Sequence, residues 1–265
     1  MKRSALTAAA ARAAHLIVDA EPFIFADTLA YQVLGEQAEE LVQYHRLHGT
    51  HPILAGARAT VTTRSHYTET RLAASGLDQY VVLGAGLDTF AYRATGIRIF
   101  EVDHPATQAR KLELLAAAGI PASATYVPVD FEQDSLTKQL VHGGLDPARP
   151  AFVSWLGVTM YLTPQAIAQT LADLSTLAPG TEIVFDYLLP EDLRDPAGQA
   201  YAAAISAHSA ENGEPWLSFF RPDQLALQGF SLIETVGQHD LPCLKNRADA
   251  LTASALSMIA HARLR

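Results

Sequence analysis

The sequence contains a single cysteine, Cys243, so no disulfide can form within the chain. One thiol also provides no cysteine cluster for a metal. Basic residues are few: 19 Lys and Arg stand against 28 Asp and Glu, and the formal net charge is −9. Proteins that bind nucleic acid or anionic membranes usually carry a basic cluster, and the sequence has none. We therefore expect no metal, no nucleic-acid partner, no membrane partner, and a reducing, cytoplasmic setting.

Long apolar runs are also missing, since no stretch approaches the ~20 residues that a membrane-spanning helix requires. The first residues, MKRSALTAAAARAAHLIV, combine a basic start with an alanine-rich run, as a signal peptide does. Arg12, His15 and Asp19 interrupt this run, so a helix is the better interpretation. With 265 residues, 49% of them apolar, the chain is long enough for one large globular domain or one domain with a cap.

Residues 1–75 and 76–265 differ in pattern. The first part is alanine-rich with helical spacing, and Gly76 is placed to end its last helix. In the second part apolar strands alternate with helices, which predicts an α/β fold with a mostly parallel sheet and helices on both faces. The expected strands are residues 80–86, 96–103, 124–131, 151–158, 181–188, 230–237 and 255–264. We therefore expect an N-terminal helical cap and an α/β domain with a substrate-facing insertion at about residues 188–222.

The stretch YVVLGAGLDTFAYR, residues 80–93, places Gly84-Ala85-Gly86 directly after the first expected strand. Ligands of open parallel sheets bind beyond the carboxyl ends of the strands, and glycines let the main chain approach a ligand closely. Asp88 or Thr89 is placed to cap a helix that follows. An ordinary strand-to-helix turn explains the glycines as well, so this motif alone does not establish a cofactor site.

The second and third expected strands end in acidic residues. Glu101 and Asp103 end the second strand, where a carboxylate can accept hydrogen bonds from ribose hydroxyls. Asp130 and Phe131 end the third, where they can contact and stack on an adenine ring. Three strand ends of this kind predict a nucleoside-bearing cofactor.

Two cofactors fit this pattern, a dinucleotide and S-adenosyl-L-methionine. A dinucleotide motif has a third small residue and places the pyrophosphate at a helix N-terminus. Here Thr89 takes that position, and the Asp88 carboxylate would repel a pyrophosphate but suits a sulfonium or ammonium group. The sequence thus favours S-adenosylmethionine over a nicotinamide oxidoreductase. A module that binds the cofactor without catalysis stays open as a further alternative.

Four segments, VVLGAGLDTFAYR, FEVDHPATQARK, YVPVDFE and GVTMYLT, resemble the leucine carboxyl methyltransferase-like family and its bacterial S-adenosylmethionine-dependent branch. The likeness runs from about Ala11 to the C-terminus. It implies a class I methyltransferase (Rossmann-like) fold with an N-terminal helical cap, and an oxygen atom as methyl acceptor. The cofactor contacts that it implies are Gly84, Gly86, Asp103, Lys111, Asp130 and Phe131.

The resemblance also concerns the amino-acid end of the cofactor. An arginine ahead of the first strand grips the cofactor's carboxylate in the family; Arg64 is the best match and Arg58 the second. The family usually has Glu-Gly before VTMYL, whereas Leu156 stands in the glutamate's place here. The contact made by that glutamate is then either weakened or moved to Asp88 or Glu101.

The acceptor is expected to be a small molecule methylated on a carboxylate or hydroxyl oxygen. A carboxylate needs no general base, whereas a hydroxyl must lose a proton. Tyr161 and Tyr187 follow the fourth and fifth strands, and His208 lies in the insertion, so these three are the candidate catalytic residues. Trp216, in GEPWLSFFRP, is placed to close over the acceptor, and we expect it to contact the acceptor together with the two tyrosines.

Overall fold

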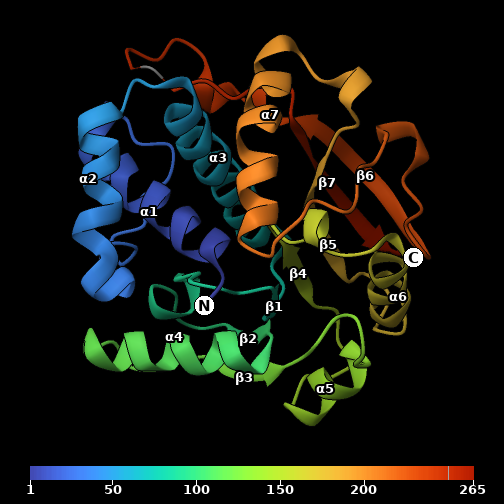
Figure 1. The fold of residues 1–265 in the computed structure, drawn as a ribbon. Coiled ribbons are helices and arrows are strands. Elements are labelled where there is room, and N and C mark those ends of the chain that lie inside the picture. Colours follow the sequence, from blue (N-terminus) through green and yellow to red (C-terminus); the bar gives the residue numbers. More distant parts are fainter. Residues whose placement is uncertain (250) are drawn as a thin grey trace.

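A computed structural model describes residues 1–249 and 251–265. One seven-stranded sheet runs through the α/β part, in the order β3-β2-β1-β4-β5-β7-β6 (Figure 1). Neighbouring strands are parallel except at β7, which is antiparallel to both β5 and β6. The strands are β1 (Gln79–Leu83), β2 (Arg98–Asp103), β3 (Thr125–Pro128), β4 (Phe152–Trp155), β5 (Glu182–Leu188), β6 (Phe230–Gly237) and β7 (Ser257–Leu264). The predicted fold class and all seven predicted strands are confirmed.

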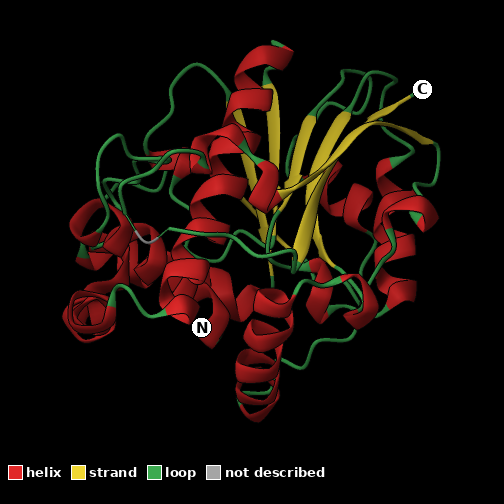
Figure 2. Ribbon diagram, turned by 90° about the horizontal axis from the view of Figure 1, so that it is seen from above, coloured by secondary structure: helices red, strands yellow, loops and turns green. Residues whose placement is uncertain are grey.

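The central strands follow from their composition. Every residue of β1, β4 and β5 is buried, because helices cover both faces of the sheet (Figure 2). From β1 the chain proceeds outward to β2 and β3 and then returns to β4 on the other side of β1. The strand order therefore reverses between β1 and β4, and in open α/β sheets ligands bind at such a reversal.

Helices that follow the strands begin with recognisable signals. His104, Thr163 and Asp195 cap α4, α6 and α7 with their side chains, and each is followed by a proline at the first helical position. The helices of this part are α4 (Pro105–Ala117), α5 (Leu136–His142), α6 (Pro164–Leu174) and α7 (Pro196–Glu211). Residues 89–95 contain only a 3-10 turn at Phe90–Tyr92, because Asp88 accepts a hydrogen bond from the backbone of Phe90 and closes a tight turn.

Three helices form the N-terminal part: α1 (Arg3–Val18), α2 (Ala38–His48) and α3 (Pro52–Ser75). The last begins earlier than its sequence spacing suggests, since His51 caps it and Pro52 occupies its first position. Gly76 ends it in the left-handed region, as predicted (φ +68°). Figure 1 shows the three helices together, with α7 beside α3, where the Tyr201 ring lies against Gly56.

The alanines of the first helix have a packing role. Ala9, Ala10, Ala13 and Ala14 are buried in one cluster with α2, α4 and Leu87 of the loop after β1. Small side chains allow α1 to approach that loop closely. Among the described residues, none of the helices combines the length and apolar character that crossing a bilayer takes.

Candidate functional site

A cavity of about 960 Å³ lies beyond the carboxyl ends of β1, β4 and β5, at the reversal of strand order. The loops after β1, β2, β3 and β4 form its sheet end, and α1, α2, α3 and α7 cover it from the other side. This volume is at the upper limit of the usual range for small-molecule sites, so the cavity has room for more than a single small ligand.

Both glycines of the loop after β1 have a left-handed backbone. Gly84 has φ +67°, and a Cβ there would lie 2.2 Å from Val158 Cγ2. Gly86 has φ +43°, and its Cβ would lie 3.2 Å from the Cβ of Ala5 on α1. The Gly86 N–H donates to Asp103 Oδ2 at 2.7 Å. The chain's own packing thus already requires these glycines, and their backbone also lines the cavity.

Three carboxylates line the sheet end of the cavity, at the ends of adjacent strands: Asp88, Asp103 and Asp130. None of the three forms an ion pair within the residues that the structure describes. Phe131 lies beside Asp130 and also lines the cavity. An end with three carboxylates that form no ion pair suits a positively charged ligand that carries hydroxyl groups, and opposes a pyrophosphate.

A buried ion pair lies between the sheet end and α3. Arg64 Nη1 is 2.8 Å from Asp186 Oδ2, and the Gly157 N–H donates to Asp186 Oδ1 at 2.6 Å. A Cβ on Gly157, whose φ is +70°, would lie 2.5 Å from Arg64 Nη2. Leu156 is half-buried and lines the same part of the cavity. Asp186 was not predicted, although its acid within an otherwise apolar strand was a usable signal.

A second buried ion pair joins the N-terminal helices to the glycine loop. Arg12 Nε lies 2.8 Å from Asp27 Oδ2, and Arg12 Nη2 donates to the Leu87 carbonyl at 2.7 Å. The Thr89 hydroxyl donates to Asp27 Oδ1 at 2.6 Å. Burial acts to raise the pKa of Asp27, but Arg12 and this hydrogen bond outweigh it and lower the pKa overall. The sequence interpretation missed both members, because they lie 15 residues apart with no motif between them.

Some predicted site residues lie away from the cavity. Glu101 is buried and pairs with Lys111 Nζ at 2.7 Å; its burial raises its pKa, although Lys111 opposes the change. Tyr187 is fully buried, and its hydroxyl lies 3.0 Å from Thr235 Oγ1. Arg58 is buried in the N-terminal part and does not line the cavity. The structure therefore does not bring these side chains to the cavity wall.

The remaining predicted residues do meet there. Tyr161 and Trp216 line the side of the cavity formed by α7 and the loop that follows it, and burial raises the pKa of Tyr161. His208 is exposed on α7 at the same wall. In the following loop, both carboxylate oxygens of Glu214 accept from Ser4, one from its hydroxyl at 2.5 Å and one from its backbone N–H at 3.0 Å. This contact joins the start of α1 to the loop after α7.

A family model for leucine carboxyl methyltransferases matches residues 5–175. The chain belongs to the leucine carboxyl methyltransferase family. YktD of Bacillus subtilis strain 168, a candidate S-adenosyl-L-methionine-dependent methyltransferase, is 35% identical over 201 residues, covering 71% of this chain and 66% of YktD. A relative with the same description from Saccharopolyspora erythraea is 39% identical over 155 residues, covering 52% of this chain and 53% of its own. The matches thus span between about half and two thirds of these relatives.

Two solved structures share the fold. A candidate methyltransferase from Thermobifida fusca has a TM-score of 0.60 at 20% identity, covering 89% of this chain and 93% of its own. A duf574 family protein from Streptomyces avermitilis has a TM-score of 0.61 at 15% identity, covering 96% and 97%. Such identities show the fold alone. The predicted family is confirmed, and the relatives in it are described as S-adenosylmethionine-dependent methyltransferases.

The cavity of this family member fits that cofactor. S-adenosylmethionine carries a sulfonium and an ammonium, which match unpaired carboxylates, and a carboxylate, which matches a guanidinium. The three acids of the sheet end and Arg64 of α3 provide this donor and acceptor set around the cavity. Within the described residues no group of His, Cys, Asp and Glu side chains has the arrangement of a metal site.

Proposed function

We propose that the chain is an S-adenosyl-L-methionine-dependent O-methyltransferase that transfers a methyl group to a carboxylate or hydroxyl oxygen of a small-molecule acceptor. Family membership supports the reaction class. The observation that carries the proposal is the cavity itself, which has an acidic sheet end with Arg64 nearby and a partly apolar wall opposite. The acidic end suits the positively charged sulfonium of the cofactor. Methyl transfer from a sulfonium does not require the acceptor to be charged.

The proposed cofactor contacts follow the strand ends. Asp103 accepts hydrogen bonds from the ribose hydroxyls, and Asp130 and Phe131 contact the adenine. Arg64 binds the cofactor's carboxylate. We assign Asp186 to the ammonium end, since its carboxylate contacts the backbone of the residue that follows Leu156. It thereby supplies an acid where the family's usual glutamate is missing.

When bound, S-adenosylmethionine supplies a methyl group on a sulfonium, which is already a good leaving group. The chain must hold the acceptor oxygen in line with that methyl and exclude water, and such positioning contributes ~7–11 kcal/mol to lowering the barrier. Trp216 and the Ser4–Glu214 contact close the wall on the acceptor side. Because burial raises the pKa of Tyr161, its hydroxyl stays protonated near neutral pH and acts as a hydrogen-bond donor rather than a base.

Calorimetry with S-adenosylhomocysteine and a labelled-methyl assay test the proposal. The Asp103→Ala variant should bind S-adenosylhomocysteine ~1.5–3 kcal/mol more weakly, the scale of a hydrogen bond to a charged group. Asp78→Ala is the matched control, because Asp78 is an exposed acid paired with Arg149 on the surface. Tight NADH binding would favour an oxidoreductase. Cofactor binding without any labelled product across a broad acceptor panel would favour the non-catalytic module.

A further inference from the structure

One part of the cavity wall, which we call the acceptor wall, is formed by α2, α3 and α7 and carries both apolar and polar side chains. Its aromatic members are Tyr44 and Tyr201, its main aliphatic members are Leu41, Ile53, Leu54, Val61 and Ile205, and its polar members include Glu40, His45, Thr60, Arg64, Ser65, His208 and Ser209. Apolar lining of this kind contributes affinity only for ligands that lose little hydration on binding.

Cations that could bind an acceptor carboxylate are already engaged or lie elsewhere, among the residues the structure describes. Arg12 and Arg64 line the cavity but pair with buried Asp27 and Asp186. Lys2 and Arg3 also line the cavity, but they are exposed and lie around the start of α1, near the start of α4, and not on α2, α3 or α7. Burying an unpaired carboxylate is costly. The acceptor wall therefore suits an uncharged acceptor.

One polar side chain of this wall is nearly buried. His45, on α2, is 6% exposed and lines the cavity. Its Nδ1 lies 3.1 Å from Arg58 Nη1. A guanidinium can only donate hydrogen bonds, so Nδ1 must be the unprotonated ring nitrogen and Nε2 must carry the hydrogen. No hydrogen bond to Nε2 is found within the described part of the chain.

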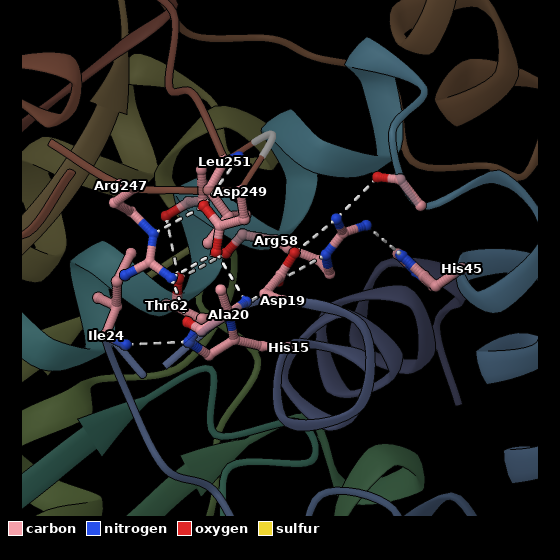
Figure 3. Close-up of polar contacts among 12 residues, drawn as sticks. His15, Asp19, Ala20, Ile24, His45, Arg58, Thr62, Arg247, Asp249 and Leu251 are labelled. Atoms are coloured by element: carbon pink, nitrogen blue, oxygen red, sulfur yellow. Dashed lines mark hydrogen bonds and ion pairs between the residues drawn. The ribbon is translucent and has the colours of Figure 1, made fainter. Parts of the chain in front are cut away.

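The partner of His45 is held in place from several sides. Arg58 makes two contacts of 2.8 Å with the Asp19 carboxylate and donates to the Gly49 carbonyl at 2.7 Å. Asp19 in turn lies 2.8 Å from His15 Nδ1. Figure 3 shows Arg58 between Asp19 and His45, with contacts to both. Since Arg58 cannot turn away, the hydrogen stays on Nε2 of His45.

The charge state of His45 follows from the same surroundings. Burial and the neighbouring Arg58 cation lower the pKa of His45 to about 4, and the attraction of Asp19 does not compensate for them. The ring is therefore neutral near pH 7. A neutral N–H can donate to a carbonyl, ether or hydroxyl oxygen without bringing a charge into the acceptor wall.

We propose that the Nε2–H group of His45 donates a hydrogen bond to an oxygen of an uncharged, largely apolar acceptor and orients that acceptor in the cavity. The inference rests on the proposed methyltransferase function. Arg58 and Asp19 act through His45 as positioning residues. The proposed hydrogen bond narrows the acceptor class, because an acceptor recognised by His45 carries a neutral oxygen in addition to the atom that is methylated.

Binding to the protein saturated with S-adenosylhomocysteine tests this, with three phenols of similar size as probes. 4′-Hydroxyacetophenone offers a ketone oxygen, 4-ethylphenol lacks it, and 4-hydroxybenzoate replaces it with a charge. The wild type should bind the ketone about five- to tenfold more tightly than 4-ethylphenol, as one net hydrogen bond predicts, and the benzoate most weakly.

His45→Phe should abolish the preference for the ketone, whereas His45→Gln, which keeps an N–H donor, should retain part of it. Both should bind S-adenosylhomocysteine as the wild type does. Nitrogen NMR of labelled histidine should show His45 neutral with its hydrogen on Nε2 at pH 7.

Four outcomes overturn the inference: no probe binding, no preference in the wild type, the same preference in His45→Phe, or a hydrogen on Nδ1. If the wild type does not bind S-adenosylhomocysteine, the proposed function is contradicted instead. The titration with S-adenosylhomocysteine alone, before any probe is added, shows this.

Discussion

Replacing Gly157 by alanine should weaken cofactor binding because it displaces the side chain of Arg64, which is itself unchanged. The new Cβ would lie 2.5 Å from Arg64 Nη2 and 2.9 Å from its Cζ, so the guanidinium must move. Moving it breaks the 2.8 Å contact with Asp186. If Arg64 binds the cofactor's carboxylate, the loss is that of a hydrogen bond between charged groups, ~1.5–3 kcal/mol or about 10- to 150-fold in affinity.

Gly96→Ala separates this effect from backbone strain. Gly96 has φ +78°, similar to the +70° of Gly157, but a Cβ there meets no atom within 4 Å. Alanine in the left-handed region should lower the free energy of unfolding by ~1–2 kcal/mol in both variants. The broken contact with buried Asp186 should add a further loss in Gly157→Ala alone. Only Gly157→Ala should reduce S-adenosylhomocysteine affinity in calorimetry. Equal affinities in the two variants would refute the assignment of Arg64 to the cofactor.

Three further predictions concern the cavity wall. Leu156→Glu should tighten S-adenosylhomocysteine binding or leave it unchanged in calorimetry, because it restores the family's acid; a large drop in melting temperature would show that Leu156 belongs to the core. Trp216→Ala should impair acceptor use, through KM or kcat in the labelled-methyl assay, while S-adenosylhomocysteine affinity stays within about twofold. Loss of both affinities would make Trp216 structural. In urea titrations, stability should fall as the pH drops from 6.5 to about 4, because His45 takes up a proton when unfolded but not when folded. His45→Gln should lose up to about 3 kcal/mol less unfolding free energy than the wild type over this pH range. The same pH dependence of stability in both proteins would contradict the lowered pKa of His45.

The sequence predicted the sheet well because the signals there are repeated along a segment. In β1, β4 and β5 consecutive apolar residues are buried on both faces, and this pattern distinguishes them from the helices between them. The acids at strand ends were also found, since Asp103 and Asp130 occupy positions where the chain leaves the sheet. Both do line the cavity.

Strand alternation explains one misplaced residue. Glu101 and Asp103 are two residues apart in β2, so their side chains share a face of the sheet. Helix α4 covers that face along the strand, and Lys111 of α4 meets Glu101 there. Only at the last residue of the strand, Asp103, does this face open to the cavity. Position relative to the strand end therefore decides which acid lines the cavity. The predicted strand ended at residue 103, as β2 does, but the sequence did not show that α4 covers Glu101.

Other site residues gave no periodic signal at all. Arg64 meets Asp186 across 122 positions of sequence, and Arg12 meets the Leu87 carbonyl across 75. His45 gains its fixed hydrogen and its lowered pKa from Arg58, which the sequence interpretation considered as a cofactor ligand. Each of these depends on how the N-terminal helices pack against the sheet, and a single charged residue in a helix carries no information about its distant partner.

The same packing bears on what family membership can say about the acceptor. The family match covers residues 5–175 and ends before α7 and the loop that carries Glu214 and Trp216. Yet that loop holds the start of α1 through Ser4, and α1 lies on the glycine loop at Gly86. The wall opposite the cofactor is thus built partly from a segment outside the match. In the proposed function the strand-end motifs bind the cofactor, whereas α7, its loop and His45 select the acceptor. Of these three, only His45 lies within the match, so the acceptor must be determined for this chain by itself.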